Sequence, residues 1–154
     1  MPLKITICGV EVDVSVQQVG AVLETLVKDG VGIPESLLVQ LARHEDWHVR
    51  ARVAGFEPLA ASVVACLVCD PAAQVRIELA DNFCAMSMTD ARTLKPFFAQ
   101  DLSLLEKAAE ALSYNPDIEQ IAADVFEAHG QVGIDVLAKA LDLCKVFESE
   151  TPGA

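Results

Sequence analysis

Hydrophobic and polar residues alternate along the first part of the chain, from Leu3 to Val14. The apolar positions in this alternation are Ile5, Ile7, Val10, Val12 and Val14. A period of two residues is typical of a β-strand with one buried face. Because Cys8 and Gly9 interrupt the pattern near its middle, the segment is predicted to form a β-hairpin that turns at these two residues or, alternatively, one extended arm.

After Ser15 the apolar spacing changes to three and four residues, which is typical of an amphipathic helix. Ser15 is a suitable cap for a helix that reaches about Asp29, where Gly30 and Gly32 end it. Pro34 then opens a second helix, because proline suits the first helical turn. Its predicted buried stripe consists of Leu37, Leu38, Leu41 and Ala42.

From this point the chain repeats a unit of helix, short acidic turn and second helix. The first unit runs from Pro34 to the pair Val49-Arg50, and the next from Pro58, through a turn at Asp70–Gln74, to the pair Val75-Arg76. The two Val-Arg pairs lie 26 residues apart and continue alike, as VRARVAG and VRIELAD. Helical repeats of 20–50 residues are the mark of a stacked array, because one helical pair cannot bury its hydrophobic face alone.

Two further copies are less regular. In the third, Thr89-Asp90 opens a helix that reaches about Ala99, Asp101 marks the turn, and Leu104 stands at the position of Val49. Residues 83–87, before this helix, are predicted to form a loop flanked by methionines. A fourth copy begins at Asn115-Pro116. The predicted apolar face of its helix consists of Ile118, Ile121, Ala122 and Val125, and Gly130 ends this helix. A last amphipathic helix is predicted over Val132–Phe147.

The repeated segments IPESLLVQLARHEDWHVRARVA and DPAAQVRIELA resemble units of leucine-rich-repeat-variant proteins and are similar to HEAT-like repeats. The clear resemblance covers residues 33–82. It implies a mainly all-α fold, a right-handed α-solenoid of helical hairpins that binds other macromolecules, and it implies no chemistry. In such stacks the Val is buried and the Arg lies between repeats. Arg50 and Arg76 are therefore interpreted as structural, with Asp46 and Asp70 as their expected partners.

We therefore expect one domain over residues 1–150. It comprises a β arm (1–14), an N-terminal helix (15–33), the repeats (34–112) and C-terminal helices (115–148), and a disordered tail follows at 151–154. Hydrophobic residues make up 53% of the chain and aromatic residues 5%, a composition that favours closely packed helices.

The net charge of −12 is unevenly distributed, since residues 101–154 hold eleven acidic and three basic residues. Such a surface repels phosphate backbones, so we expect no nucleic-acid partner. The acidic part is either a plain solvated face or a contact surface for a basic protein. No stretch is long enough for a membrane span, and no signal peptide is visible, so a cytoplasmic location without membrane contact is expected.

The five cysteines, an odd number, indicate reduced thiols. Cys66 and Cys69 lie in an apolar segment and are predicted to fill gaps in the core. A metal site built from these two residues and Cys84 is the alternative, for which a fourth ligand is missing.

Residues His44, Glu45 and His48 match the HExxH pattern of zinc hydrolases. In those enzymes both imidazoles lie on one helix, four residues apart, and converge on one ion. The repeat register instead places His44–Asp46 on the turn between two helices, where the histidines would not share a face. A small zinc hydrolase using this motif remains the alternative to a non-catalytic protein without cofactor or catalytic residues.

The prediction that follows is a protein–protein interaction module, and its narrower form is an acidic inhibitor or immunity-type protein. Its binding face would be lined by the second helices of the repeats. The candidate contact residues are Trp47, His48, Arg52, Gln74 and Glu78. Trp47, the single tryptophan, is expected to pack on a neighbouring turn, with an exposed anchor for a partner as the alternative. The sequence does not determine the oligomeric state.

Overall fold

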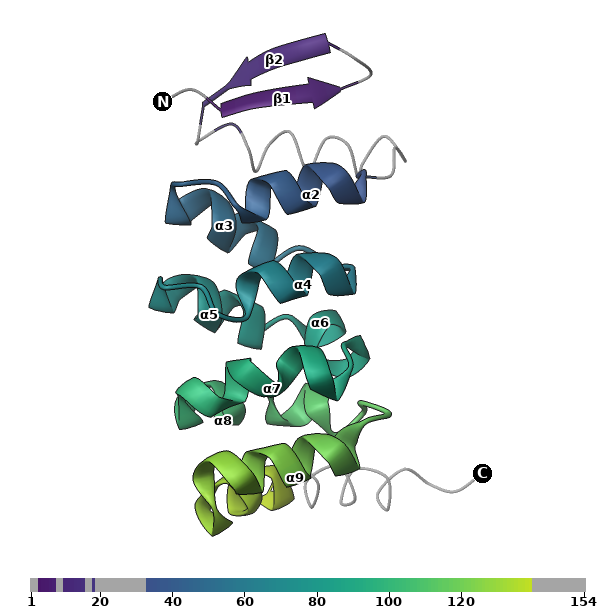
Figure 1. The fold of residues 1–154 in the computed structure, drawn as a ribbon, viewed down its shortest axis with the longest axis vertical. Coiled ribbons are helices and arrows are strands. Elements are labelled where there is room, and N and C mark those ends of the chain that lie inside the picture. Colours follow the sequence, from purple (N-terminus) through teal and green to yellow (C-terminus); the bar gives the residue numbers. More distant parts are fainter. Residues whose placement is uncertain (1–2, 8–9, 16–17, 19–32, 140–154) are drawn as a thin grey trace, which may run out of the picture.

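The computed structural model describes residues 3–7, 10–15, 18 and 33–139, and these are mainly helical (Figure 1). Strands β1 (Leu3–Ile7) and β2 (Val10–Val14) pair antiparallel, with Leu3 opposite Val14 and Ile7 opposite Val10. This pairing fits the predicted hairpin and not a single extended arm. The turn residues Cys8 and Gly9, and nearly all of the helix predicted for residues 15–29, lie outside the described residues.

The first helical pair consists of α2 (Glu35–Ala42) and α3 (Trp47–Ala54). Pro34 stands at the N-cap of α2, and the predicted stripe of four apolar residues is buried, as expected. The chain bends between the helices because Asp46 caps α3: its carboxylate accepts a hydrogen bond from the backbone N–H of His48 at 2.9 Å. The predicted turn at residues 44–46 is therefore confirmed.

The second pair consists of α4 (Ala61–Leu67) and α5 (Ala73–Ala80). The predicted turn extended to Gln74, but α5 already begins at Ala73. Asp70 stabilises the shorter turn by accepting a hydrogen bond from the backbone N–H of Ala72 at 2.9 Å. The prediction of a loop over residues 83–87 is wrong. These residues belong to a short helix, α6 (Phe83–Met88), which Asn82 caps by accepting from Ala85 N–H and which buries Ala85 and Met86.

Three further helices follow: α7 (Ala91–Gln100), α8 (Leu102–Leu112) and α9 (Ile118–His129). Asp90 caps α7, which opens where the sequence predicts. Asp101 lies in the predicted turn and also caps α8, and Leu104 is buried. Gly130 ends α9 with a positive φ of 70°. Residues 131–139 are helical again, one residue earlier than predicted. The predicted helix beyond residue 139 and the predicted tail at 151–154 lie outside the described residues.

The helices follow one another in layers along the long axis of the molecule (Figure 1). Helix α2 contacts α4, α3 contacts α5, α5 contacts α8, and α7 contacts α9. One cluster of buried side chains runs through these layers, from Leu37 to Leu137. Each pair thus buries its apolar face against the next. None of the helices in the described part is long and apolar enough to cross a membrane.

Candidate functional site

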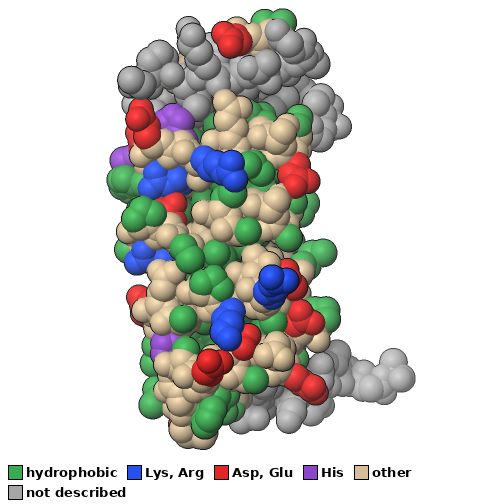
Figure 2. All heavy atoms as spheres, in the orientation of Figure 1, with side chains coloured by type: hydrophobic (Ala, Val, Ile, Leu, Met, Phe, Trp, Pro, Cys, Tyr) green, Lys and Arg blue, Asp and Glu red, His purple; other side chains and the backbone are tan. Residues whose placement is uncertain are grey.

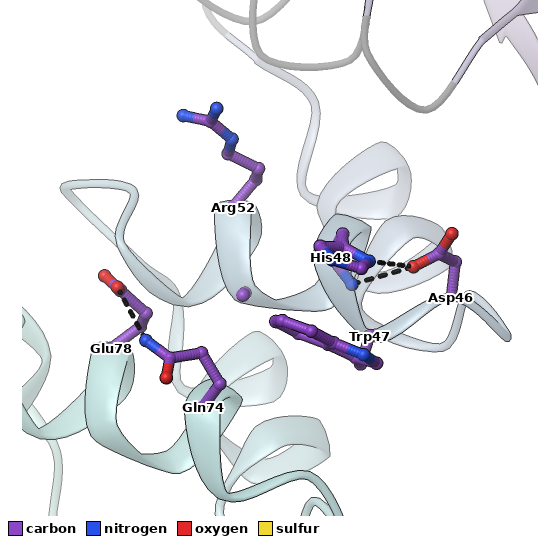
Figure 3. Close-up of a pocket in the computed structure, with 7 residues that line it drawn as sticks. Asp46, Trp47, His48, Arg52, Gln74 and Glu78 are labelled. Atoms are coloured by element: carbon purple, nitrogen blue, oxygen red, sulfur yellow. Dashed lines mark hydrogen bonds and ion pairs between the residues drawn. The ribbon is translucent and has the colours of Figure 1, made fainter.

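A cavity of about 700 Å³ lies between the first turns of α3 and α5 (Figure 3). Its lining consists of Asp46, Trp47, His48, Ala51, Arg52, Gln74 and Glu78. All five residues that the sequence singled out as contact candidates belong to this lining. The structure therefore brings them together in one place, although they come from two different helical pairs.

The repeat explains why these side chains meet. Helices α3 and α5 lie side by side, and each begins directly after an acidic turn, so their first turns stand at the same edge of the stack. Residues four apart on a helix share a face, which aligns His48 with Arg52 and Gln74 with Glu78. Sequence reasoning missed Asp46 and Ala51 as lining residues. Ala51 lies four residues after Trp47, and this spacing was the available signal.

Trp47 is 40% exposed and is not part of the core. Its indole stacks on the ring of His48, with the ring centroids 3.7 Å apart and the planes inclined by 24°. In Figure 3 the indole extends from the start of α3 toward Gln74 of α5. The direction of the indole agrees with the expectation that Trp47 packs toward the neighbouring unit, and its exposure agrees with the alternative of an anchor for a partner. Because the His48 imidazole stacks on the indole and restricts its orientation, the exposed ring is a preformed surface for contact.

The charged groups of the cavity differ in how well they are paired. Asp46 accepts from His48 N–H and contacts His48 Nδ1, both at 2.9 Å, and the first of these contacts contributes most to holding the pKa of Asp46 below its usual range. Glu78 is partly buried, and its carboxylate has one contact among the described residues, to Gln74 Nε2 at 3.5 Å. Arg52 is exposed and points away from Glu78 (Figure 3). The cavity therefore presents a carboxylate that no cation of the described chain neutralises.

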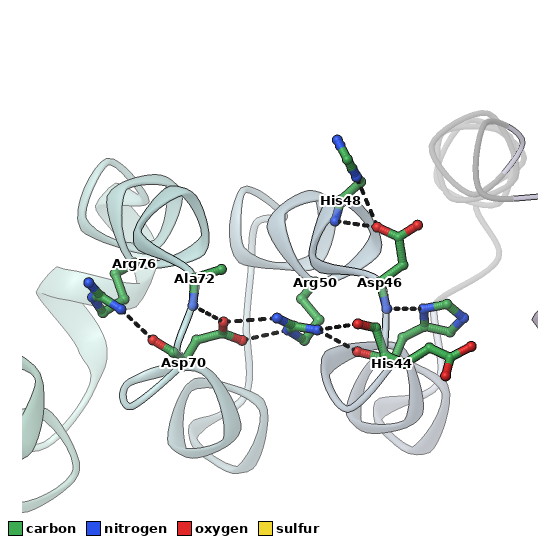
Figure 4. A network of polar contacts seen from close by, with 8 residues as sticks. His44, Asp46, His48, Arg50, Asp70, Ala72 and Arg76 are labelled. Carbon is green, nitrogen blue, oxygen red and sulfur yellow. Dashed lines mark hydrogen bonds and ion pairs between the residues drawn. The ribbon is translucent and has the colours of Figure 1, made fainter.

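The HExxH residues do not form the helical arrangement of a zinc hydrolase. Helix α2 ends at Ala42 and α3 begins at Trp47, so His44 lies in the turn and His48 in the next helix. His44 Nδ1 accepts from the backbone N–H of Asp46 at 3.0 Å, and Asp46 lies between the two histidines in Figure 4. The two rings therefore do not share one face of one helix, as convergence on a single ion would require.

The three cysteines in the described part of the chain differ in how far they are exposed to solvent. Cys66 is partly buried and packs against the core, as predicted, whereas Cys69 is exposed because α4 has already ended at Leu67. The prediction of a buried Cys69 is therefore wrong. Burial, followed by the nearby Glu57, raises the pKa of Cys84, which keeps this thiol protonated. Within the described residues, no group of three or more His, Cys, Asp or Glu side chains could hold a metal ion.

A polar network joins the first two helical pairs below the cavity (Figure 4). Arg50 donates to both carboxylate oxygens of Asp70, with Nε at 2.7 Å from Oδ2 and Nη2 at 3.1 Å from Oδ1. Its Nη1 also donates to the carbonyls of His44 and Glu45, at 2.7 and 3.0 Å. Asp70 is thus confirmed as an acidic partner, but the same expectation for Asp46 is wrong, because that carboxylate caps α3.

Arg76 occupies the equivalent position in the second pair, and its contacts differ. Its Nη1 donates to the backbone carbonyl of Asp70 at 2.6 Å, and its buried Nε has no hydrogen-bond partner among the described residues. The carbonyl contact agrees with the structural interpretation of this residue. Both arginines therefore hold the turn between helices, and neither lines the cavity.

Two buried asparagines, which sequence reasoning missed as structural residues, connect successive layers at the other ends of the helices. Asn82 donates from its amide to the carbonyls of Ala54 and Phe56, at 2.9 and 2.8 Å. Asn115 donates in the same way to Met86 and Thr89, at 2.8 and 2.7 Å. Each follows the second helix of a pair and satisfies carbonyls 26–29 residues earlier in the chain. The Asn82 bonds thus join the two layers that carry the cavity, and the Asn115 bonds join the layers that follow.

The cavity combines an indole, an imidazole, an amide, two carboxylates and one guanidinium, a set suited to holding a polar or charged side chain. The residues that line it belong to helices joined by a buried ion pair, so their arrangement is preformed. Comparison with family models, curated proteins and solved structures found no match to this chain.

Proposed function

We propose that the protein is a non-catalytic protein–protein interaction module built on HEAT-like helical repeats, and that the cavity between α3 and α5 is its contact site. The observation that carries this proposal is the convergence of Trp47, His48, Arg52, Gln74 and Glu78 on one cavity from two helical pairs. A site divided between adjacent units is the usual way in which repeat arrays bind extended partners.

The proposed architecture is a right-handed α-solenoid. Three features support it: the layered helix contacts, the turn-spanning arginines at one edge, and the asparagine bonds at the other edge. Repeated contacts between neighbours are expected in such arrays, because each unit is stabilised mainly by the next one.

The exposure of Trp47 supports a protein as the partner. Tryptophan is enriched among the residues that dominate the binding energy of interfaces, and here 40% of its surface is exposed. The cavity volume of about 700 Å³ lies within the range of roughly 300–1,000 Å³ that is typical of ligand pockets. One or two side chains of a partner fit such a space.

The partner is proposed to be a basic protein, and the module to act as an acidic inhibitor or immunity-type protein. The net charge of −12 supports this proposal, since opposite charge accelerates and orients association. On the face shown in Figure 2 the basic side chains are scattered among acidic, hydrophobic and uncharged ones. That distribution favours a protein partner over a nucleic acid, which would call for a basic stripe. A cytoplasmic location is part of the proposal and rests on the odd number of cysteines.

Affinity capture with matched variants tests the proposed function. The tagged wild-type chain is used to capture partners from an extract of the cells that make it, in parallel with Trp47→Ala and with Phe126→Ala. Phe126 is an exposed apolar residue on α9, outside the cavity lining. We expect a stoichiometric protein with the wild type and Phe126→Ala and its loss with Trp47→Ala. Recovery of no protein, or equal recovery with all three, would contradict the proposal.

A further inference from the structure

We infer that the cavity receives a lysine or arginine side chain from a basic, extended segment of the partner protein. The inference rests on the proposed function and specifies what occupies its site. It starts from Glu78, a partly buried residue whose carboxylate has a single long hydrogen bond among the described residues, from the neutral amide of Gln74. A carboxylate that has no cationic partner in the free protein favours binding of a cationic group.

The arrangement of the other charges points the same way. The cavity lining contains two carboxylates, Asp46 and Glu78, and one guanidinium, that of Arg52. Arg52 could have neutralised Glu78, but in Figure 3 it extends away from that carboxylate and the structure forms no ion pair between them. An incoming cation therefore meets Glu78 inside the cavity, and Arg52 remains at the surface.

Trp47 adds a surface for the aliphatic part of such a side chain. One side of the indole is stacked on His48, and the ring lines the cavity opposite Gln74 and Glu78. Long cationic side chains pack their methylene groups on apolar surfaces while the charged end reaches a polar partner. Cations also favour the faces of indole rings. The occupant is thus a side chain with an apolar stem and a positive end.

The test uses octalysine and octaglutamate peptides as probes, with binding followed by calorimetry and by the fluorescence of Trp47, the single tryptophan of the chain. The variants are Glu78→Gln and, as a charge-matched control, Glu106→Gln, which changes an exposed residue of α8 outside the cavity. Octalysine is expected to bind the wild type and to shift its fluorescence. Glu78→Gln is expected to weaken binding at least about fivefold. Glu106→Gln is expected to weaken it less than about twofold.

Trp47→Leu, measured by calorimetry, should weaken octalysine binding by a similar factor to Glu78→Gln, and circular dichroism confirms that each variant is folded. Equal weakening by Glu78→Gln and Glu106→Gln would show that net charge alone attracts the peptide, and would overturn the inference. Absence of octalysine binding, or tighter binding of octaglutamate, would overturn it as well. If the capture experiment still recovers a partner that depends on Trp47, the proposed function stands while this inference falls.

Discussion

Arg50 of α3 and Asp70 of the next helical pair form a two-bonded ion pair, with side chains that are 13% and 3% exposed. Asp70 at the same time accepts from the backbone N–H of Ala72 just before α5, and Arg50 donates to two carbonyls in the turn before α3. The pair therefore joins the starts of the two helices that line the cavity. Its geometry sets the distance between the two halves of the proposed binding site.

Removal of the guanidinium should destabilise the fold strongly. Arg50→Ala leaves the Asp70 carboxylate buried without a counter-charge, and such a loss typically costs about 3–5 kcal/mol. We expect a reduction of this size in the free energy of unfolding, measured by urea denaturation followed by circular dichroism. Arg52→Ala, an exposed arginine two residues away, should change it by less than about 0.5 kcal/mol. Similar effects of the two substitutions would contradict the structural role assigned to Arg50.

The asparagines at the other edge of the stack should also be important for stability. Asn82→Ala and Asn115→Ala each leave two backbone carbonyls of the preceding layer without a donor. Buried groups left unpaired in this way cost about 1–3 kcal/mol. Urea denaturation of each variant tests this, with Gln120→Ala on the exposed face of α9 as the control. A loss no larger than that of the control would show that water replaces these bonds.

The asparagines illustrate what local sequence patterns leave out. Helix starts at Pro34 and Asp90 were predicted because the signals for a helix start lie within one turn of each other. The partners of Asn82 and Asn115 lie 26–29 residues earlier, and no local pattern reports such contacts. Asn82 also starts the missed helix α6, because its side chain accepts from the backbone N–H of Ala85.

The cavity was predictable in part for a related reason. The repeat register placed residues such as His48 and Gln74 at equivalent positions of adjacent units, and stacking brings equivalent positions together. The exposure of Trp47 and Cys69 depends on where helices end and on what the next layer covers. Those are properties of the tertiary arrangement, and side-chain type alone predicted a buried Cys69 and left the exposure of Trp47 open.

Two substitutions of Asp46, the N-cap of α3 at the edge of the cavity, should reduce stability to different extents. Asp46→Ala removes the acceptor for His48 N–H, and loss of an N-cap lowers the free energy of unfolding. Asp46→Asn keeps an acceptor oxygen and should lose only a fraction of that stability. Thermal unfolding of both variants measures the difference. Equal losses would indicate that the charge of Asp46, and not its hydrogen bond, stabilises the start of α3.

Acid should weaken the fold through three caps of this kind. The pKa values of Asp46, Asp90 and Asp101 are lowered mainly by hydrogen bonds from His48 N–H, the Thr93 side chain and Ser103 N–H, respectively. A carboxyl whose pKa is lower in the folded state contributes stability that is present above the unfolded pKa. That stability is lost as the pH falls through the folded pKa, below pH ~4. We expect the urea midpoint to fall between pH 6 and pH 3.

The three caps can be separated from the other acidic groups by a triple variant. With asparagine at positions 46, 90 and 101, the acceptors no longer titrate, so the fall of the urea midpoint between pH 6 and pH 3 should be smaller than in the wild type. An equal fall in both proteins would assign the acid sensitivity to carboxyls other than these caps.

Two glycines provide a last test of how closely the C-terminal helices pack. A Cβ at Gly133 would stand 2.6 Å from Val125 Cγ1 and 3.0 Å from His129 Cβ, so α9 and the helical residues 131–139 leave no space for a methyl group. Overpacking of this kind costs about 1–3 kcal/mol. Gly133→Ala should therefore lower the free energy of unfolding by that amount.

Gly55 makes a matched comparison, because its backbone has a helical φ of −84° and a Cβ there would meet Glu78 Oε2 at an ordinary 3.5 Å. Gly55→Ala should be neutral or raise stability by about 0.4–1 kcal/mol, since alanine restricts the unfolded chain. If Gly133→Ala is as well tolerated as Gly55→Ala in urea denaturation, the helix after Gly130 does not pack on α9 as closely as the structure places it.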